Sequence, residues 1–209
     1  MARFAQDSET ETAIFHAAMT VFARKGKDGA RMQEIADEAG INKALLHYYY
    51  RSKDGLYEAV FTQVIAHFMS TVERQLDDDQ PFADVLRNII DAYVDEHRAH
   101  PEVARMWMHE NLNGAPVARA FLQAQMDRGR ETTLARIVRR IRKAVADGEI
   151  NDVDPVHTFI SILGASVFFF LGVPTFSVLR PEIAENPDAV AGERKTHIFD
   201  LIYHGLEPR

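Results

Sequence analysis

The sequence predicts an all-α fold of about nine helices, in which an N-terminal module of three helices is joined by a long helix to a larger helical domain. Nearly every segment carries apolar residues at three- and four-residue spacing, and no segment shows the sustained alternation typical of strands. Glycine and proline fall between these segments, where helices end. The 209 residues are 46% hydrophobic, enough to bury a continuous core, and the absence of cysteine excludes a disulfide scaffold.

Local signals place the three helices of the N-terminal module. Ser8 and Glu11 form a capping-box pair, in which each side chain can satisfy a free backbone amide at a helix start. This first helix is expected to stop before Gly26. Short helices are then expected over residues 32–39 and 43–49.

The long connecting helix is expected to begin at Ser52, whose hydroxyl is placed to cap it, and to end in the acidic turn 77–79. An amphipathic helix follows Pro81 and is broken by Pro101. A shorter apolar helix is expected over residues 103–108.

The C-terminal half is expected to hold one long helix from Pro116 to about Gly148, an apolar helix over residues 156–173 and, after a proline-rich connection over 174–187, a closing helix. The apolar helix raises the question of a membrane span. A span needs about 20 mostly apolar residues, whereas this stretch is at the short limit and contains His157. We therefore interpret it as a helix buried between other helices or at a subunit interface, with no membrane partner.

Residues 32–49 have the spacing of a helix-turn-helix. Two helices that cross closely need a small residue at Ala36 and a residue that tolerates a positive φ at Gly40. Apolar residues hold the crossing angle, and here they are Ile35, Ile41 and Leu46. Asn42 is placed to cap the second helix. On spacing alone, a generic helical hairpin with a glycine turn remains an equal alternative.

The flanking residues extend this match. Residues 22–60 read FARKGKDGARMQEIADEAGINKALLHYYYRSKDGLYEAV, which closely resembles the DNA-binding domain of the TetR family of transcriptional regulators. The shared marks are Phe22, Gly26, Ile35-Ala36, Ala39-Gly40-Ile41, Tyr48 to Tyr50, Ser52-Lys53 and Leu56. The resemblance implies a DNA-binding domain over residues 1–52 and an effector-binding and dimerisation domain over residues 53–209. It also implies a homodimer on double-stranded operator DNA, without a cofactor or enzymatic activity.

The resemblance further implies which side chains face the DNA: Lys43, Ala44, Leu45, His47, Tyr48, Tyr49 and Lys53. Arg31, in place of the family's hydroxyl, and Asn42, at the start of the second helix, complete the candidate set. Lys53 and the free amides of a helix N-terminus both favour a phosphate oxygen. Lys43, Ala44 and Leu45 are placed to read base edges. Three departures from the family pattern bear on the choice of operator. Arg31 stands near the usual Ser or Thr position, His47 and Tyr49 are exchanged, and Tyr50 replaces Phe.

The distribution of charge agrees with a small DNA-binding surface in the N-terminal module. The whole chain has a net charge of -7, which argues against a surface that coats nucleic acid or anionic membranes indiscriminately. Residues 1–55 hold equal numbers of basic and acidic side chains, so the excess acid lies beyond them. Residues 42–53 contain no acid at all.

For the larger domain, the resemblance implies a small-molecule effector and a dimer interface. Met and aromatic residues suit an adaptable apolar cavity, although plain core packing is the alternative for each of them. The candidate lining residues are Tyr93, Trp107, Met108, Phe121, Met126 and Phe168. The apolar helix and the closing helix together predict a four-helix interface between two chains. Its candidate residues are Phe159, Leu163, Phe168, Leu171, Ile198, Leu201 and Ile202.

Other patterns are interpreted without a separate function. The basic run from Arg128 to Lys143 is expected to be a solvated helix face, because apolar residues occupy the opposite face. The nine histidines match no metal-binding spacing, so no metal is expected. No phosphate loop or nucleophile elbow is present, and no secretory signal precedes the first helix, which favours the cytoplasm. The alternative function is a helical small-molecule-binding or enzymatic protein whose head does not bind DNA.

Overall fold

The computed structural model describes residues 2–208, with side chains from residue 8 onward, so the charges of Arg3 and Asp7 counted above lie outside the described side chains. Within residues 2–208 all regular structure is helical, which confirms the predicted all-α fold. The helices are α1 (Ala2–Gly29), α2 (Met32–Glu38), α3 (Lys43–Tyr49), α4 (Lys53–Glu73), α5 (Phe82–Ala99), α6 (Pro101–Leu112), α7 (Pro116–Asp127), α8 (Thr133–Ala146), α9 (Pro155–Leu179), α10 (Glu182–Glu185) and α11 (Pro187–Leu206).

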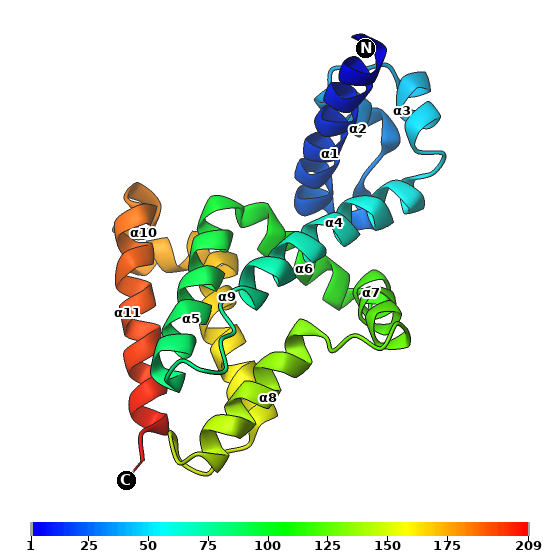
Figure 1. The fold of residues 1–209 in the computed structure, drawn as a ribbon. Helices are drawn as coiled ribbons and strands as arrows, with labels where there is room; N and C mark the ends of the chain where they lie inside the picture. The colour runs from blue at the N-terminus through cyan, green and yellow to red at the C-terminus, as the bar shows by residue number, and fades with distance from the viewer. Residues whose placement is uncertain (1, 209) are drawn as a thin grey trace. The chain divides into compact units, whose positions relative to one another are not determined.

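The chain divides into two compact units, and the first comprises residues 1–66 and 105–124. Helices α1, α2 and α3 gather around the start of α4 (Figure 1). The largest fully buried side chains here include Ile14, Phe22 and Leu56. Gly26 interrupts α1 with a φ of 68° and a ψ of 174°, at the position where the sequence predicted the end of the first helix.

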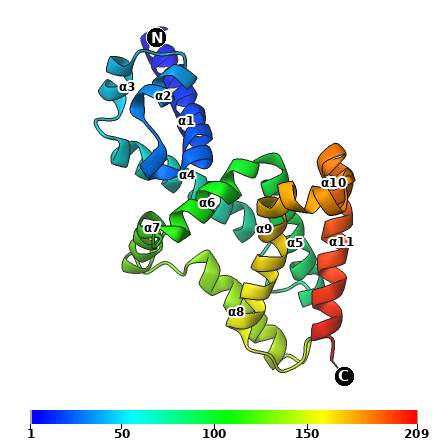
Figure 2. The ribbon, with the colours of Figure 1, turned by 180° about the vertical axis from the view of Figure 1, so that it is seen from behind.

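The second unit comprises residues 67–104 and 125–209. Helix α5 packs against α9 and α11, and α8 packs against α9 (Figure 1). Viewed from behind, α10 joins α9 to α11 at one end of this unit (Figure 2). Helix α5 buries an apolar stripe that includes Leu86 and Ile90. Truncating such a residue to alanine typically costs about 2–5 kcal/mol of stability.

Several predicted helix boundaries are wrong. Helix α1 already begins at Ala2, so Ser8 lies inside it and is not its cap; alanine, arginine and glutamine upstream are good helix formers. The single helix predicted from Pro116 to Gly148 is divided into α7 and α8. Gly129 adopts a φ of 68° in the break, and the Thr132 hydroxyl then caps α8 by accepting from the Ala135 amide over 3.2 Å.

The apolar helix is longer than predicted, because α9 continues through Pro174 to Leu179. A proline removes one backbone hydrogen bond but does not prevent the helix from continuing when other contacts hold the next turn. Here the rings of Phe169 and Phe176 stack across that turn, with centroids 6.5 Å apart. The expected connection over residues 174–187 therefore contains the end of α9 and the short helix α10.

One member of the basic run is not solvated, contrary to the prediction. Arg140 is 1% exposed, and its guanidinium lies 3.0 Å from Glu149 and donates to the Gln80 carbonyl over 2.7 Å. Burial by itself would raise the pKa of Glu149, but the hydrogen bonds from Arg140 and from the Phe82 amide outweigh it and lower that pKa. Arg140 is thus a structural ion-pair residue, whereas Arg139 and Arg142 remain exposed.

Candidate functional site

The turn between α2 and α3 has the geometry that the spacing predicted. Gly40 has a φ of 67°, a left-handed conformation that glycine adopts without strain. The Ile41 amide donates to the Ala36 carbonyl over 3.0 Å, which closes the end of α2. Ile35, Ala36 and Leu46 are completely buried where the helices cross. The two helices therefore form a helix-turn-helix whose second helix, α3, is held at a fixed angle.

Helix α3 presents an exposed face in the first unit. The Asn42 side chain accepts a hydrogen bond from the Leu45 amide over 2.8 Å, so it caps α3 as predicted. Four of the predicted contact residues are exposed on α3: Lys43, Ala44, His47 and Tyr48. Leu45 and Tyr49 are half-buried, and the Tyr48 and Tyr49 rings meet edge to face. The face combines a cation, hydroxyls and a small side chain, the groups that contact phosphates and base edges.

Exposed basic side chains are present on α3 and in the segments before α2 and after α3. Three are exposed and form no ion pair with a described residue: Arg31, Lys43 and Arg51. Two acids of the first unit are paired, Glu34 with Lys25 and Asp54 with Lys27, whereas Asp37 and Glu38 at the end of α2 form no ion pair with a described residue. The hydrogen bond from Lys25 lowers the pKa of Glu34, so this carboxylate stays ionised and neutralises Lys25. The stretch that includes α3, residues 42–53, carries Lys43, Arg51 and Lys53 and no acid, so the charge on this segment is positive.

Lys53 has a structural role that sequence reasoning did not identify. Its ammonium donates to the carbonyls of Asp28 and Ala30, over 3.1 Å in each case. Ser52 caps α4, as predicted, by accepting from the Gly55 amide over 3.1 Å. An ammonium has three N–H donors, so one remains for a phosphate. These carbonyls lie more than twenty residues away along the chain, and no local sequence signal announces the contact.

A buried polar cluster, also unpredicted, joins α4, α6 and α7 in the first unit. Glu110 is 2% exposed and accepts from the Tyr57 hydroxyl over 2.8 Å. It also accepts from the amides of Val117 and Ala118, over 2.6 and 3.1 Å, at the start of α7. Burial, aided by the hydrogen bond to Glu110, raises the pKa of Tyr57, so its hydroxyl remains a donor. Tyr57 packs edge-on against Phe22 of α1.

The six residues predicted to line an effector cavity divide between the two units. Trp107, Met108 and Phe121 belong to the first unit, and Tyr93, Met126 and Phe168 to the second. The Trp107 ring stacks on Phe61 with centroids 5.9 Å apart. Tyr93 is buried, whereas Met126 and Phe168 are more than half exposed. That these six line one cavity stays a prediction.

The residues predicted for the dimer interface have unequal exposure. Phe159 and Ile198 are buried within the second unit, whereas Phe168 and Leu201 are exposed by 59% and 65%. The remaining three are half-buried: Leu163, Leu171 and Ile202. Sequence reasoning did not name Ile160, which is 54% exposed on α9.

Helix α9 is unusually apolar for a helix so little covered by its own chain. By length and composition alone it could cross a membrane, and only 17% of its most apolar window is buried. Core helices of water-soluble proteins pass the same test of length and composition. Its exposed stripe includes Ile160, Gly164 and Phe168, which follow one another at four-residue spacing.

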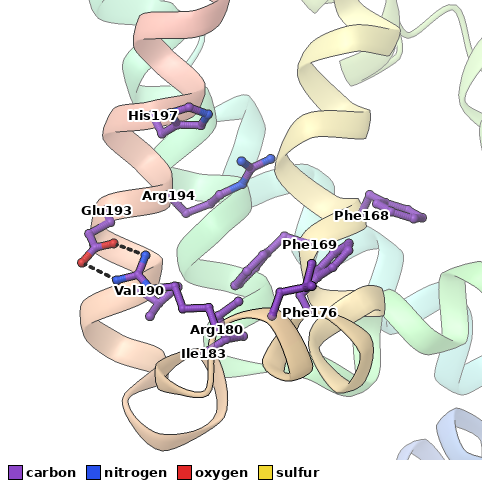
Figure 3. Close-up of a pocket in the computed structure, with 10 residues that line it drawn as sticks. Phe168, Phe169, Phe176, Arg180, Ile183, Val190, Glu193, Arg194 and His197 are labelled. Atoms are coloured by element: carbon purple, nitrogen blue, oxygen red, sulfur yellow. Dashed lines mark hydrogen bonds and ion pairs between the residues drawn. The ribbon is translucent and has the colours of Figure 1, made fainter.

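A cavity of about 480 Å³ lies between α9, α10 and α11 in the second unit (Figure 3). Of the predicted cavity residues only Phe168 contributes to it. Phe169 and Phe176 form its aromatic wall, and a Cβ at Gly172 would lie only 2.3 Å from the Phe176 ring. Its polar lining residues are Arg180, Glu193, Arg194 and His197. Sequence periodicity did not predict this cavity, because residues 174–187, which contain α10, were expected to be an irregular connection.

Metal ligation finds no support among the described residues, where no three His, Cys, Asp or Glu side chains gather in a way that could hold an ion. The paired acids of the first unit are occupied by lysines, as described above.

Comparison with family models covers both parts of the chain. The model for bacterial regulatory proteins of the tetR family matches residues 14–60. The model for the tetracyclin repressor-like C-terminal domain matches residues 83–202.

Individual relatives agree with these matches. The chain is 33% identical to the HTH-type transcriptional repressor SCO4008 of Streptomyces coelicolor, over 81% of this chain and 83% of the relative. It is 27% identical to the HTH-type transcriptional regulator RutR of Escherichia coli, over 97% of this chain and 92% of the relative. The fold is similar to the crystal structure of PfmR, a TetR family transcriptional regulator from Thermus thermophilus. That similarity has a TM-score of 0.70 at 20% identity and covers 94% of this chain and 96% of the other.

Proposed function

Because the chain belongs to the TetR family of bacterial transcriptional regulators, we propose that it is a homodimeric repressor that binds a specific operator through α3 and is released by a small, largely apolar effector. We assign DNA binding to residues 1–52 and effector binding and dimerisation to residues 53–209, as the sequence suggested. A regulator of transcription acts at the chromosome, so we also propose that the protein is cytoplasmic.

The observation that carries the DNA-binding proposal is the exposed, acid-free face of α3. Lys43 and Tyr48 lie on the exposed side of a helix whose other side is fixed by the buried Leu46. Arg31 precedes α2 and Arg51 follows α3, and neither forms an ion pair with a described residue. Phosphate contacts from such side chains set register and salt dependence, and contacts from α3 to base edges set sequence preference.

A mobility-shift assay on the DNA upstream of the chain's own gene tests this proposal. We expect Lys43→Ala to weaken binding and to change base preference, because Lys43 faces base edges. We expect Lys53→Ala to weaken binding to all sequences alike, because Lys53 holds the α1–α2 connection and a phosphate. Arg142→Ala, which removes an exposed charge from the second unit, is the matched control and should bind as the unaltered chain does. The absence of a sequence-specific complex at low salt would favour the alternative, a small-molecule-binding or enzymatic protein whose N-terminal module does not bind DNA.

The homodimer is supported by the uncovered apolar surface of the second unit. Ile160 and Phe168 on α9 and Leu201 on α11 are large apolar side chains that remain more than half exposed in one chain. Exposed apolar stripes of this kind mark interfaces in water-soluble proteins. Sedimentation should show a dimer for the unaltered chain and a monomer for Ile160→Glu combined with Leu201→Glu. A dimer that survives both changes would place the interface elsewhere.

The effector proposal rests on the methionine and aromatic content of the predicted cavity residues. Trp107 is the single tryptophan, so its fluorescence reports on ligand binding near α6 without a label. We expect a co-purified or added apolar ligand to change this fluorescence and to lower operator affinity in parallel. A ligand that changed only the fluorescence would not be an effector.

A further inference from the structure

The cavity between α9, α10 and α11 contains an unusual arginine. Arg194 extends from α11 into the space between α11 and α9 (Figure 3). Its guanidinium donates one hydrogen bond, to the Ala165 carbonyl over 2.9 Å, and lies 5.9 Å from the centre of the Phe169 ring. The side chain is half-buried, and its shielded Nε has no hydrogen-bond partner among the described residues.

The other charges of the cavity do not neutralise Arg194. Arg180 and Glu193 bind each other through two hydrogen bonds of 2.7 and 3.1 Å. Glu182 also lies near Arg180, at 3.8 Å, and His197 is exposed one turn along α11. Burial lowers the pKa of Arg194, as expected for a cation that has lost water without gaining a carboxylate. Arg194 is therefore the unpaired charge of the lining.

Much of the remaining lining is apolar. Phe168, Phe169 and Phe176 come from α9, and Ile183 and Val190 complete the wall from α10 and α11. A cavity of about 480 Å³ with an apolar wall and one unpaired charge is of the size that takes small organic ligands. A guanidinium with unused N–H donors binds a carboxylate best, because two parallel hydrogen bonds form.

We propose that this cavity binds a small organic carboxylate with an aromatic body, whose carboxylate pairs with Arg194 and whose ring lies against Phe169 and Phe176. The site shares only Phe168 with the six residues predicted for the effector, and it goes beyond the proposed function, since it requires no DNA binding. The competing occupant of Arg194 is a carboxylate of the second copy in the dimer. The guanidinium lies between two helices of its own chain, a position that a small molecule enters more readily than a helix face does.

Isothermal titration calorimetry of the full chain, without DNA, tests the proposal. The probes are naphthalene-2-carboxylate and its neutral isostere naphthalene-2-carboxamide. We expect the acid to bind at least about tenfold more tightly than the amide, because a hydrogen-bonded charge pair is worth at least one such factor. Arg194→Gln should abolish this preference, and Arg142→Gln, an exposed arginine of the same unit, should preserve it. Phe176→Leu should weaken acid and amide alike, and it retains a readout if Arg194→Gln fails to fold.

Three outcomes would overturn the proposal. Equal affinity for acid and amide would remove the role of charge, and an unchanged preference in Arg194→Gln would remove the role of this residue. If the acid fails to bind and Arg194→Gln dissociates the dimer in sedimentation, the occupant is the second copy. Because no operator is present in the calorimeter, failure here is distinguishable from failure of DNA binding in the mobility-shift assay.

Discussion

Replacing Glu110 by alanine should loosen the start of α7 more than any single surface change in the first unit. The carboxylate accepts three hydrogen bonds, of which those from the Tyr57 hydroxyl and the Ala118 amide are buried and that from the Val117 amide is partly buried. Hydrogen bonds to a charged group contribute about 1.5–3 kcal/mol each, and truncation leaves the buried donors unpaired. With two buried bonds and incomplete additivity, we expect Glu110→Ala to cost about 3–5 kcal/mol.

Amide hydrogen exchange measures this loss directly, because the amides of Val117 and Ala118 are themselves the donors. We expect their protection to fall by that amount in Glu110→Ala, and by less in Glu110→Gln, which keeps an accepting oxygen. The matched control is Glu58→Ala, an exposed glutamate on α4 that should change stability by less than about 0.5 kcal/mol. If the two amides keep their protection in Glu110→Ala to within that margin, the cluster does not stabilise α7 and the reasoning is refuted.

Three further predictions concern the cap of α3, the buried His97 and the interruption of α1 at Gly26. Asn42→Ala should lower the stability of α3 by about 1 kcal/mol and weaken operator binding, whereas Asn42→Asp, which keeps the accepting oxygen, should retain both; amide exchange within α3 and mobility shifts give the answer. Burial lowers the pKa of His97 from its ordinary 6.5, so acid protonates His97 in the unfolded chain before it does so in the folded chain. The contribution of neutral His97 to the free energy of unfolding is therefore complete above pH 6.5 and is lost as the pH falls below it. Urea unfolding should therefore show a steeper loss on acidification in the unaltered chain than in His97→Phe, with a difference of at most about 1.4 kcal/mol per pH unit, and equal slopes would contradict this role. Gly26→Ala should cost at least about 1 kcal/mol because the φ there is 68°. A Cβ would also lie 3.0 Å from the His109 ring, so adding His109→Ala should restore only part of the loss in thermal unfolding.

The helix-turn-helix and the start of α4 could be predicted because the sequence signals for them are local. Gly40, Asn42 and Ser52 each act on residues within a few positions of themselves, through a turn or a cap. Spacing therefore sufficed to place both helices, and the exposed side of α3 followed from the burial of Leu46.

Three features that sequence reasoning missed depend on how separate segments of the chain pack together. Arg140 continues a basic helical run in the sequence. It is buried because the fold brings Glu149 and the Gln80 carbonyl into contact with its guanidinium. Lys53 likewise bears no mark of its bonds to Asp28 and Ala30. The cavity around Arg194 required α9 to pass through Pro174, which a boundary rule for proline excludes.

The hydrogen bond between Tyr57 and Glu110 also has a consequence for synthesis of the chain. The two residues are 53 positions apart, and the first unit is built from two stretches of sequence separated by residues 67–104, which include the whole of α5. While the ribosome is still making α5, the hydroxyl of Tyr57 has no carboxylate to meet. Contacts between such distant residues form late, because the intervening loop must close first. The first unit therefore reaches its native packing only once α7 has emerged, although its N-terminus is the first part of the protein to be made.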